Sequence, residues 1–306
     1  MPRFLKLCLT LLALLTFSLS IGRAADLKIG YYNKTATITM VGPIVRGDYD
    51  RFRQTVGKIA DEGGIVTHLY IFSPGGLVNE ALNIGRLAGK LALTTVAPTY
   101  DPAVPEKRQC SFREHTSPTK FVDHKWRYDA FKRSGNPACN CASACFLIWA
   151  AGAERQGNYL GIHRTFFRPQ SFKEDSFAVA RERYVKLRKS VTSYLTEMNI
   201  PNLVINTMFS VASNEIEPLA PQFVRILQGG VELEEYLRAH CTAESVLYDF
   251  HTSALELLNS LSTDKASGKY KDALGKRNAA YEKKFSCEVK VRKKIFTNAW
   301  AKVSAN

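Results

Sequence analysis

Three short segments carry residue types that could perform nucleophilic chemistry. They are Ser73-Pro74-Gly75-Gly76, Cys141-Ala142-Ser143-Ala144-Cys145 and Gly161-Ile162-His163-Arg164. A serine hydroxyl is a poor nucleophile at neutral pH, and histidine is its usual base. The segments therefore indicate a serine nucleophile, a histidine base and a backbone site for developing negative charge.

The residues around the serine and the glycine pair suit these roles for steric reasons. Glycine has no Cβ, so the N–H of Gly75 or Gly76 can approach an oxygen and stabilise an oxyanion. Ser143 stands before an apolar stretch, as in a nucleophile elbow, where the N–H of the next residue (here Ala144) completes the oxyanion hole. Each segment alone also fits an ordinary role: a strand-to-helix turn, a helix-capping serine or a structural histidine.

Together and in this order, the segments resemble those of the Clp protease proteolytic subunit, in the ClpP/crotonase superfamily. In that family one strand ends in Ser-Pro-Gly-Gly, a small-Ser-small turn supplies the nucleophile, and another strand ends in Ile-His with the base. The likeness spans about residues 34–228 and is closest to exported bacterial ClpP-like proteins with a Cys-x-Ser-x-Cys nucleophile motif. It implies stacked ββα units, Ser143 as nucleophile and His163 as base. It also implies an oxyanion hole formed by Gly75 or Gly76 with Ala144.

The sequence departs from the family pattern at the third member of the triad. The family usually has an aspartate downstream of the histidine, and the corresponding stretch here places Asn214 at that point. An asparagine can orient an imidazole through its side-chain oxygen, but it adds no negative charge. A shift of one residue would put Glu215 there instead, and the sequence leaves both open.

The N-terminus has the pattern of a secretory signal peptide. Arg3 and Lys6 precede an apolar run at 7–20, and Gly22 and Ala24 place small residues at the −3 and −1 positions of a cleavage site. We therefore expect a signal peptide at 1–25 and a periplasmic or secreted protein. An uncleaved N-terminal anchor is the alternative.

Charge and composition narrow the classes of partner. The 306 residues include 42 Lys+Arg and 28 Asp+Glu, and losing Arg3, Lys6 and Arg23 with the leader lowers the formal charge from +14 to +11. Collagen-like, low-complexity and disordered classes are excluded. A basic run at 283–294 could contact anionic lipid, polysaccharide or nucleic acid, although such a run is usually a solvated face. The aromatic signatures of RNA-binding modules are absent, so no nucleic-acid partner is expected.

The cysteine count fits an oxidising compartment. Without the leader, an even number remains: Cys110, Cys139, Cys141, Cys145, Cys241 and Cys287. We predict a Cys241–Cys287 disulfide, and that Cys110 pairs with Cys139 or Cys141. The clustered cysteines with His163 are acceptable zinc ligands, but their spacing matches no familiar zinc pattern. We therefore expect no metal and no cofactor.

Hydrophobic spacing predicts the elements that must position these residues. Strands are expected at 36–41, 65–72, 93–97 and 158–162, and helices at 49–59, 77–91, 144–151 and 184–198. This alternation indicates an α/β fold with parallel strands and covering helices at 26–230. Residues 98–138 break the pattern and are interpreted as an inserted loop that could cover or block the cleft. Residues 231–306 are predicted to form a small, basic helical domain.

These features predict an ATP-independent serine hydrolase, most simply a peptidase acting on peptides or proteins. Outside the cytoplasm no ATP is available, so no ATPase partner is expected. Family members build inter-ring contacts near the helix at 172–198, which leaves homo-oligomerisation open. The rival hypothesis is an inactive crotonase-fold binding module with a basic C-terminal interaction domain. Acyl-CoA chemistry on the same fold is weaker, because it does not need the Ser–His pair.

Overall fold

The computed structural model describes residues 24–32, 35–100, 110–111, 141–167, 173, 175–228, 231–261 and 268–305. The predicted signal peptide up to residue 23, nearly all of the predicted insertion, and Cys139 lie outside the described residues. Ala25 is fully buried and its carbonyl oxygen accepts a hydrogen bond from Arg51 Nη2 at 2.8 Å. Ala25, the last residue of the predicted leader, is therefore packed into the fold.

A five-stranded sheet forms the centre of the molecule. It consists of β1 (Asp26–Tyr32), β2 (Thr35–Val41), β3 (Ile65–Phe72), β4 (Thr94–Val96) and β8 (Glu154–Gln156), in that order. Strand β1 runs antiparallel to β2, and the remaining neighbours are parallel. The predicted α/β class with parallel strands is confirmed.

A second, three-stranded sheet carries two of the three chemical segments. Its order is β10 (Glu217–Pro218), β9 (Leu160–Ile162) and β7 (Cys141–Ala142), with β7 parallel to β9 and β10 antiparallel to it. A further pair, β5 (Thr99–Tyr100) with β6 (Cys110–Ser111), is antiparallel.

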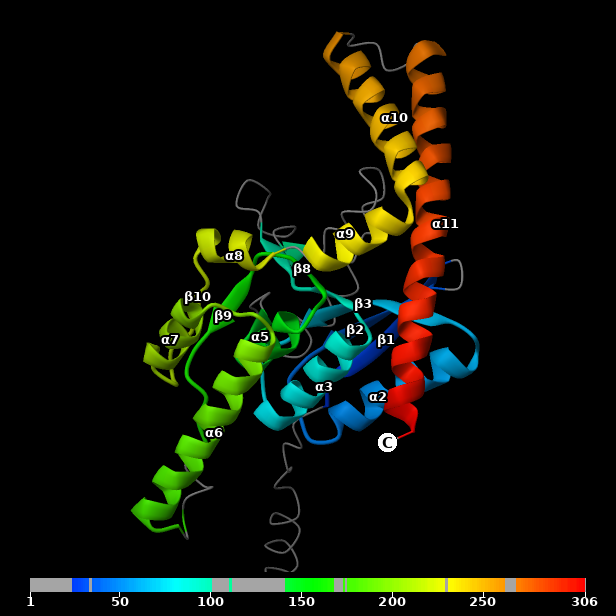
Figure 1. The fold of residues 1–306 in the computed structure, drawn as a ribbon. Coiled ribbons are helices and arrows are strands. Elements are labelled where there is room, and N and C mark those ends of the chain that lie inside the picture. The colour runs from blue at the N-terminus through cyan, green and yellow to red at the C-terminus, as the bar shows by residue number, and fades with distance from the viewer. Residues whose placement is uncertain are drawn as a thin grey trace, which may run out of the picture.

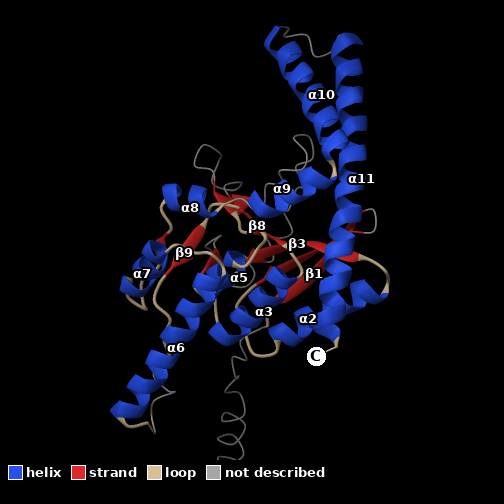
Figure 2. Ribbon diagram, viewed as in Figure 1, coloured by secondary structure: helices blue, strands red, loops and turns tan. Residues whose placement is uncertain are grey.

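Four helices pack around these sheets where the apolar spacing predicts them. They are α2 (Asp48–Asp61), α3 (Val78–Lys90), α5 (Ala144–Ala150) and α6 (Phe177–Glu197). Helix α2 buries Phe52, Val56 and Ile59, the stripe expected of an amphipathic helix. Figure 2 shows α2 and α3 lying across the sheet. Helix α6 begins earlier than predicted. Its first turns were missed because they are exposed and carry no apolar stripe.

Several short elements escaped prediction. Strand β1 is an exposed edge strand without clear alternation, and β8 has only three residues. Helices α7 (Asn202–Ser210) and α8 (Pro221–Leu227) flank β10. Such short pieces give too little periodicity to be recognised from sequence.

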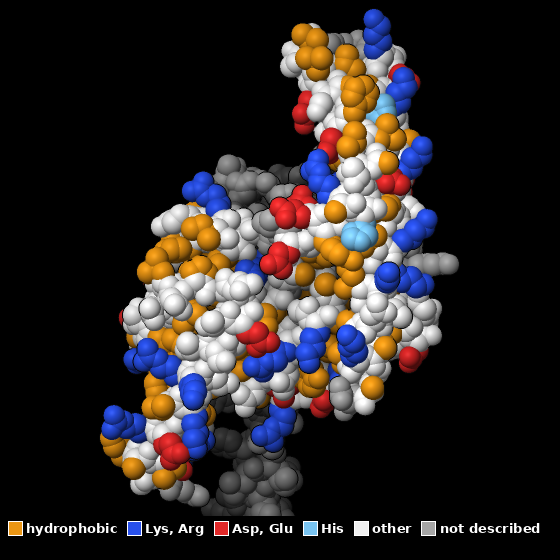
Figure 3. All heavy atoms as spheres, in the orientation of Figure 1, with side chains coloured by type: hydrophobic (Ala, Val, Ile, Leu, Met, Phe, Trp, Pro, Cys, Tyr) orange, Lys and Arg blue, Asp and Glu red, His pale blue; other side chains and the backbone are white. Residues whose placement is uncertain are grey.

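The C-terminal part is helical, as predicted, and it is also joined to the α/β core. Helix α9 (Val231–His240) leads into α10 (Thr242–Leu261), which pairs with α11 (Gly268–Ser304) in a hairpin that projects from the body (Figure 1). The last turns of α11 return to the sheet, where Phe296 is buried in the main hydrophobic core. Lys and Arg side chains follow the outer edge of α11 in Figure 3.

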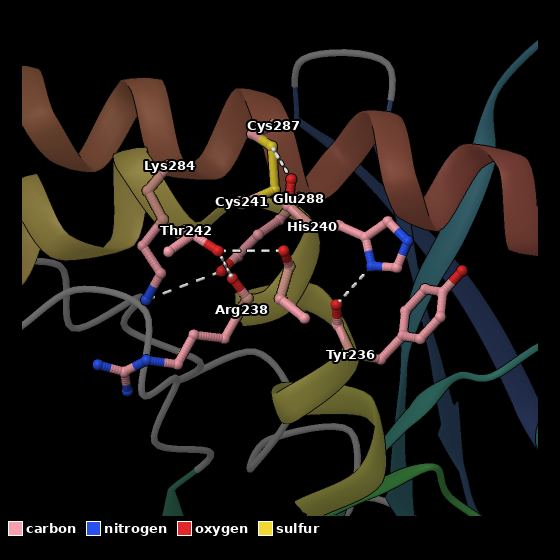
Figure 4. Close-up of a disulfide and its surroundings, with 9 residues drawn as sticks. Tyr236, Arg238, His240, Cys241, Thr242, Lys284, Cys287 and Glu288 are labelled. Carbon is pink, nitrogen blue, oxygen red and sulfur yellow. Dashed lines mark hydrogen bonds and ion pairs between the residues drawn. A yellow bond between two sulfur atoms is a disulfide. The ribbon is translucent and has the colours of Figure 1, made fainter.

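A disulfide fixes the base of this hairpin. Cys241, at the α9–α10 junction, is bonded to Cys287 on α11 (Figure 4). The predicted Cys241–Cys287 pairing is confirmed. Within the described ranges, no helix has the length and apolar character needed to cross a membrane.

Candidate functional site

Ser143 occupies a strained turn between β7 and α5. Its backbone has φ 58° and ψ −122°, a conformation that residues with a Cβ rarely adopt and that is expected of a nucleophile elbow. Ser143 N–H donates to Gly161 O at 2.9 Å, and Ser143 O accepts from Phe146 N–H at 3.0 Å. From residue 141 to 151, Ser143 alone is not buried. Ser143 is therefore the one partly exposed residue of an otherwise buried segment.

A second disulfide brackets this turn. Cys141 on β7 is bonded to Cys145 in the first turn of α5, with the Cα atoms 5.1 Å apart. The prediction that Cys141 could serve as the partner of Cys110 is therefore wrong. Because the sulfur atoms of Cys141 and Cys145 are bonded to each other, neither is available as a zinc thiolate ligand. The side chain of Cys110 lies outside the described part of the chain.

The glycine segment lies directly against Ser143. It follows β3, and its first residue, Ser73, pairs with Cys141 in a parallel bridge. Gly75 has φ 103°, and a Cβ built on it would lie 2.5 Å from Ser143 Cβ and 2.9 Å from Ser143 Oγ. On the other side, Gly76 pairs with Ile44. Neither position has room for a side chain, because Gly75 lies against Ser143 and Gly76 lies against Ile44.

The two candidate glycine donors are not equivalent. Gly75 N–H donates to Ser73 Oγ at 3.0 Å and is already used. Among the described residues, no hydrogen bond takes up the N–H of Gly76 or of Ala144. Ala144 starts α5, where backbone N–H groups have no acceptor within the helix. Of the predicted oxyanion donors, Gly76 and Ala144 are therefore the two whose N–H groups are free to bind a ligand.

His163 directly follows β9 and is 7% exposed. Its Nδ1 lies 2.9 Å from the carbonyl oxygen of Arg164. A carbonyl oxygen can only accept, so Nδ1 carries the proton and Nε2 has the free lone pair. Burial lowers the pKa of His163, and the bond to the Arg164 carbonyl opposes this shift. The lowered pKa favours the neutral imidazole, with its lone pair at Nε2.

Ser143 and His163 leave the same end of neighbouring parallel strands. Ala142 on β7 is paired with Gly161 on β9, one and two residues before the serine and histidine. No hydrogen bond joins Ser143 Oγ to the His163 ring within the described part of the chain. The fold gathers the two residues at one sheet edge and leaves the Oγ–Nε2 bond unmade.

The two candidates for the third triad position do not reach the histidine. Their loop is attached beside it, since Arg164 N–H donates to Val211 O at 3.3 Å and Glu217 pairs with Ile162. Asn214 and Glu215 are both exposed, and neither is hydrogen-bonded to His163 among the described residues. The Arg164 carbonyl holds Nδ1 instead. Sequence reasoning missed it because a backbone acceptor leaves no mark on residue type.

Apolar side chains flank the site. The ring of Phe166 is 5.9 Å from that of His163 and is 47% exposed, and Leu77, next to Gly76, is 43% exposed.

Across the described ranges, no group of three His, Cys, Asp or Glu side chains is placed to hold a metal ion. Comparison with protein-family models found no matching model, and comparison with curated proteins found no match.

Proposed function

We propose that this chain is an exported, ATP-independent serine hydrolase of the ClpP/crotonase type, acting on peptide bonds. One observation carries the proposal: Ser143 stands in a positive-φ turn against Gly75, at the same sheet edge as His163, whose Nδ1 is held by the Arg164 carbonyl. A turn that costs conformational energy yet exposes a hydroxyl favours a chemical role over a structural one.

The proposed acylation step uses three groups. Ser143 Oγ attacks the carbonyl carbon while His163 Nε2 takes the hydroxyl proton. The N–H groups of Gly76 and Ala144 stabilise the tetrahedral oxyanion. Collapse of this intermediate breaks the C–N bond, and the imidazolium gives its proton to the leaving amine.

Deacylation repeats the sequence with water. His163 Nε2 takes a proton from the water, whose oxygen attacks the acyl carbon. The acyl–Oγ bond then breaks and the proton returns to Ser143. The Oγ–Nε2 hydrogen bond through which acylation starts is not made among the described residues of the free protein. Such bonds are commonly long or poorly aligned in apo catalytic sites and tighten when substrate binds.

His163 is oriented in this scheme by a backbone group. The Arg164 carbonyl fixes the tautomer that leaves Nε2 basic. It bears no formal charge, so it stabilises the imidazolium less than a carboxylate would. Asn214 remains the alternative orienting residue if its loop closes on substrate binding.

Export is supported by the disulfides and by the N-terminal sequence pattern. Two disulfides, Cys141–Cys145 and Cys241–Cys287, suit an oxidising compartment. ATP is not available there, so the hydrolase acts without an unfolding ATPase.

A second candidate function is an inactive binding module on the same scaffold. The unmade Ser143–His163 bond favours it, as does the basic outer face of α11, which offers contacts to an anionic partner. This candidate predicts a folded, unreactive protein.

Labelling with a fluorophosphonate probe separates the two. Attack by Ser143 forms an Oγ–P bond and expels fluoride, with the hydroxyl proton passing to His163. The mature protein should be labelled on the peptide that contains Ser143, and Ser143→Ala should abolish the signal. Ser193→Ala, which removes an exposed serine on α6, is the matched control and should label normally. Absence of labelling in the folded wild type would favour the binding module.

A further inference from the structure

We propose that the Cys141–Cys145 disulfide is a positioning element that holds the Ser143 turn in its reactive conformation. This inference rests on the proposed hydrolase function. The disulfide joins the strand before the nucleophile to the helix after it, so that Ser143 lies at the centre of the closed ring.

The conformation of Ser143 requires such support. A serine with φ 58° and ψ −122° is outside the favoured regions for residues with a Cβ, and it persists only if its surroundings impose it. Backbone hydrogen bonds at Ser143 N and O supply part of this constraint. The disulfide supplies a covalent constraint across the same five residues.

Close packing makes the position of the turn critical. The Ser143 side chain occupies the space that a side chain on Gly75 would need, because a Cβ added to Gly75 would lie only 2.5 Å from Ser143 Cβ. A turn that relaxed to an ordinary backbone conformation would move Oγ relative to both the glycine segment and His163. Reactivity should therefore depend on the disulfide more steeply than folding does.

The length of the ring separates this role from general stabilisation. A disulfide constrains the unfolded chain less when it closes a shorter loop. Cys141 and Cys145 are four positions apart, whereas Cys241 and Cys287 are 46 apart. The longer bridge is expected to contribute more to global stability, and the shorter one to local geometry.

Burial indicates a permanent clamp instead of a redox switch. Cys141 and Cys145 are both fully buried, and thiol–disulfide exchange requires access to a sulfur atom. Cys287 is partly exposed, so a soluble dithiol should reduce Cys241–Cys287 first. Treatment of the native protein with dithiothreitol should leave the reactivity of Ser143 intact.

The test compares two double variants of the full mature protein. Cys141→Ala with Cys145→Ala removes the clamp, and Cys241→Ala with Cys287→Ala is the matched control that removes the remote bridge. Cys141→Val with Cys145→Ala is a second clamp variant that restores some of the lost volume on β7. The rate of fluorophosphonate inactivation, the apparent probe affinity, the melting temperature and hydrogen exchange at 141–146 are measured for each.

The clamp variant should lose inactivation rate by about ten- to a hundredfold with little change in probe affinity, and exchange at 141–146 should accelerate. The control should melt at a lower temperature and label at the wild-type rate per folded molecule. Wild-type labelling of the clamp variant, or a loss equal to that of the control, would overturn the proposal. So would failure of both clamp variants to fold, because the bridge would then be a general stabiliser.

Hydrogen exchange keeps the two proposals distinguishable. If the wild type is not labelled at all, the hydrolase proposal fails, and the clamp is judged by exchange alone. Unchanged exchange at 141–146 in the folded clamp variant overturns the clamp, and faster exchange confined to that segment supports it.

Discussion

The side chain of His163 is held by the backbone of its own neighbour: Nδ1 donates to the carbonyl oxygen of Arg164 at 2.9 Å. This bond sets the tautomer and aligns the ring without a carboxylate. Burial, which this bond opposes, lowers the pKa of the imidazole and so favours its neutral form.

The first prediction concerns the pH dependence of labelling. Burial lowers the pKa of His163, so its neutral, basic form persists below the ordinary histidine pKa of about 6.5. The fluorophosphonate inactivation rate should stay high as pH falls to 6.5 and reach half its maximum only at a lower pH. Rates measured between pH 5 and 8.5 provide the check, corrected for hydrolysis of the probe. A midpoint above 6.5 would contradict the assignment.

The second prediction concerns the residues considered for the third triad position. Asn214 and Glu215 are exposed and make no hydrogen bond to His163 within the described part of the chain. Asn214→Ala and Glu215→Ala should each change the inactivation rate by less than about threefold, below the 10²–10⁴ typical of acid–base groups. His163→Ala is the positive control. A hundredfold loss in the Asn214 variant would show that its loop closes on the histidine during reaction.

The sequence predicted most of the elements that carry strong periodicity. The spacing of Phe52, Val56 and Ile59 defines α2, and the mainly apolar and β-branched sequence of β3 is typical of a strand buried on both faces. The order of the three segments also indicated one site containing Ser143 and His163, and the structure places both directly after neighbouring parallel strands. These features depend on the spacing and order of residues along the chain, which the sequence shows directly.

What escaped prediction depends on tertiary geometry. The Arg164 carbonyl and the used N–H of Gly75 are backbone groups, which are independent of residue type. The burial of Phe296 in the main core could not be inferred either, because the sequence of α11 is basic and does not show which part of the fold its apolar residues contact. The Cys141–Cys145 pair had a local signal, since residues four apart across a turn into a helix can meet.

The third prediction tests the contact between the glycine segment and the nucleophile. Gly75→Ala places a methyl group 2.5 Å from Ser143 Cβ and forces φ 103° on a residue with a side chain. The inactivation rate should fall by about a hundredfold or more, as when an oxyanion site is disrupted. Gly63→Ala is the matched control, because Gly63 also has a positive φ but open space around it. It should cost about 1 kcal/mol of stability and leave labelling unchanged.

The fourth prediction concerns the attachment of α11 to the sheet. Arg292 Nη2 lies 3.2 Å from Glu154 Oε2, which also accepts from Thr94 Oγ1 at 2.6 Å. Both charged side chains are largely buried, so Glu154→Gln removes the carboxylate charge that compensates the guanidinium and should cost about 2 kcal/mol in chemical denaturation. Lys276→Gln, which breaks an exposed pair with Asp272 on the same helix, should cost less than about 0.5 kcal/mol. Equal effects would mean that the Arg292 pair does not secure α11.

The fifth prediction concerns His68, which lies on β3 and interacts electrostatically with Arg292 and Glu154. Burial, with a smaller contribution from Arg292 opposed by Glu154, lowers the pKa of His68 to about 4. The unfolded chain binds a proton here below pH 6.5 and the folded chain does not, so stability is lost as pH falls from about 6.5 to about 4. The wild type should lose up to about 3 kcal/mol more than His68→Gln over this interval, measured by denaturant titration at each pH. Glu288, whose burial raises its pKa, opposes the trend equally in both proteins. Parallel pH profiles for the two proteins would show that His68 takes up its proton in the folded state as readily as in the unfolded chain.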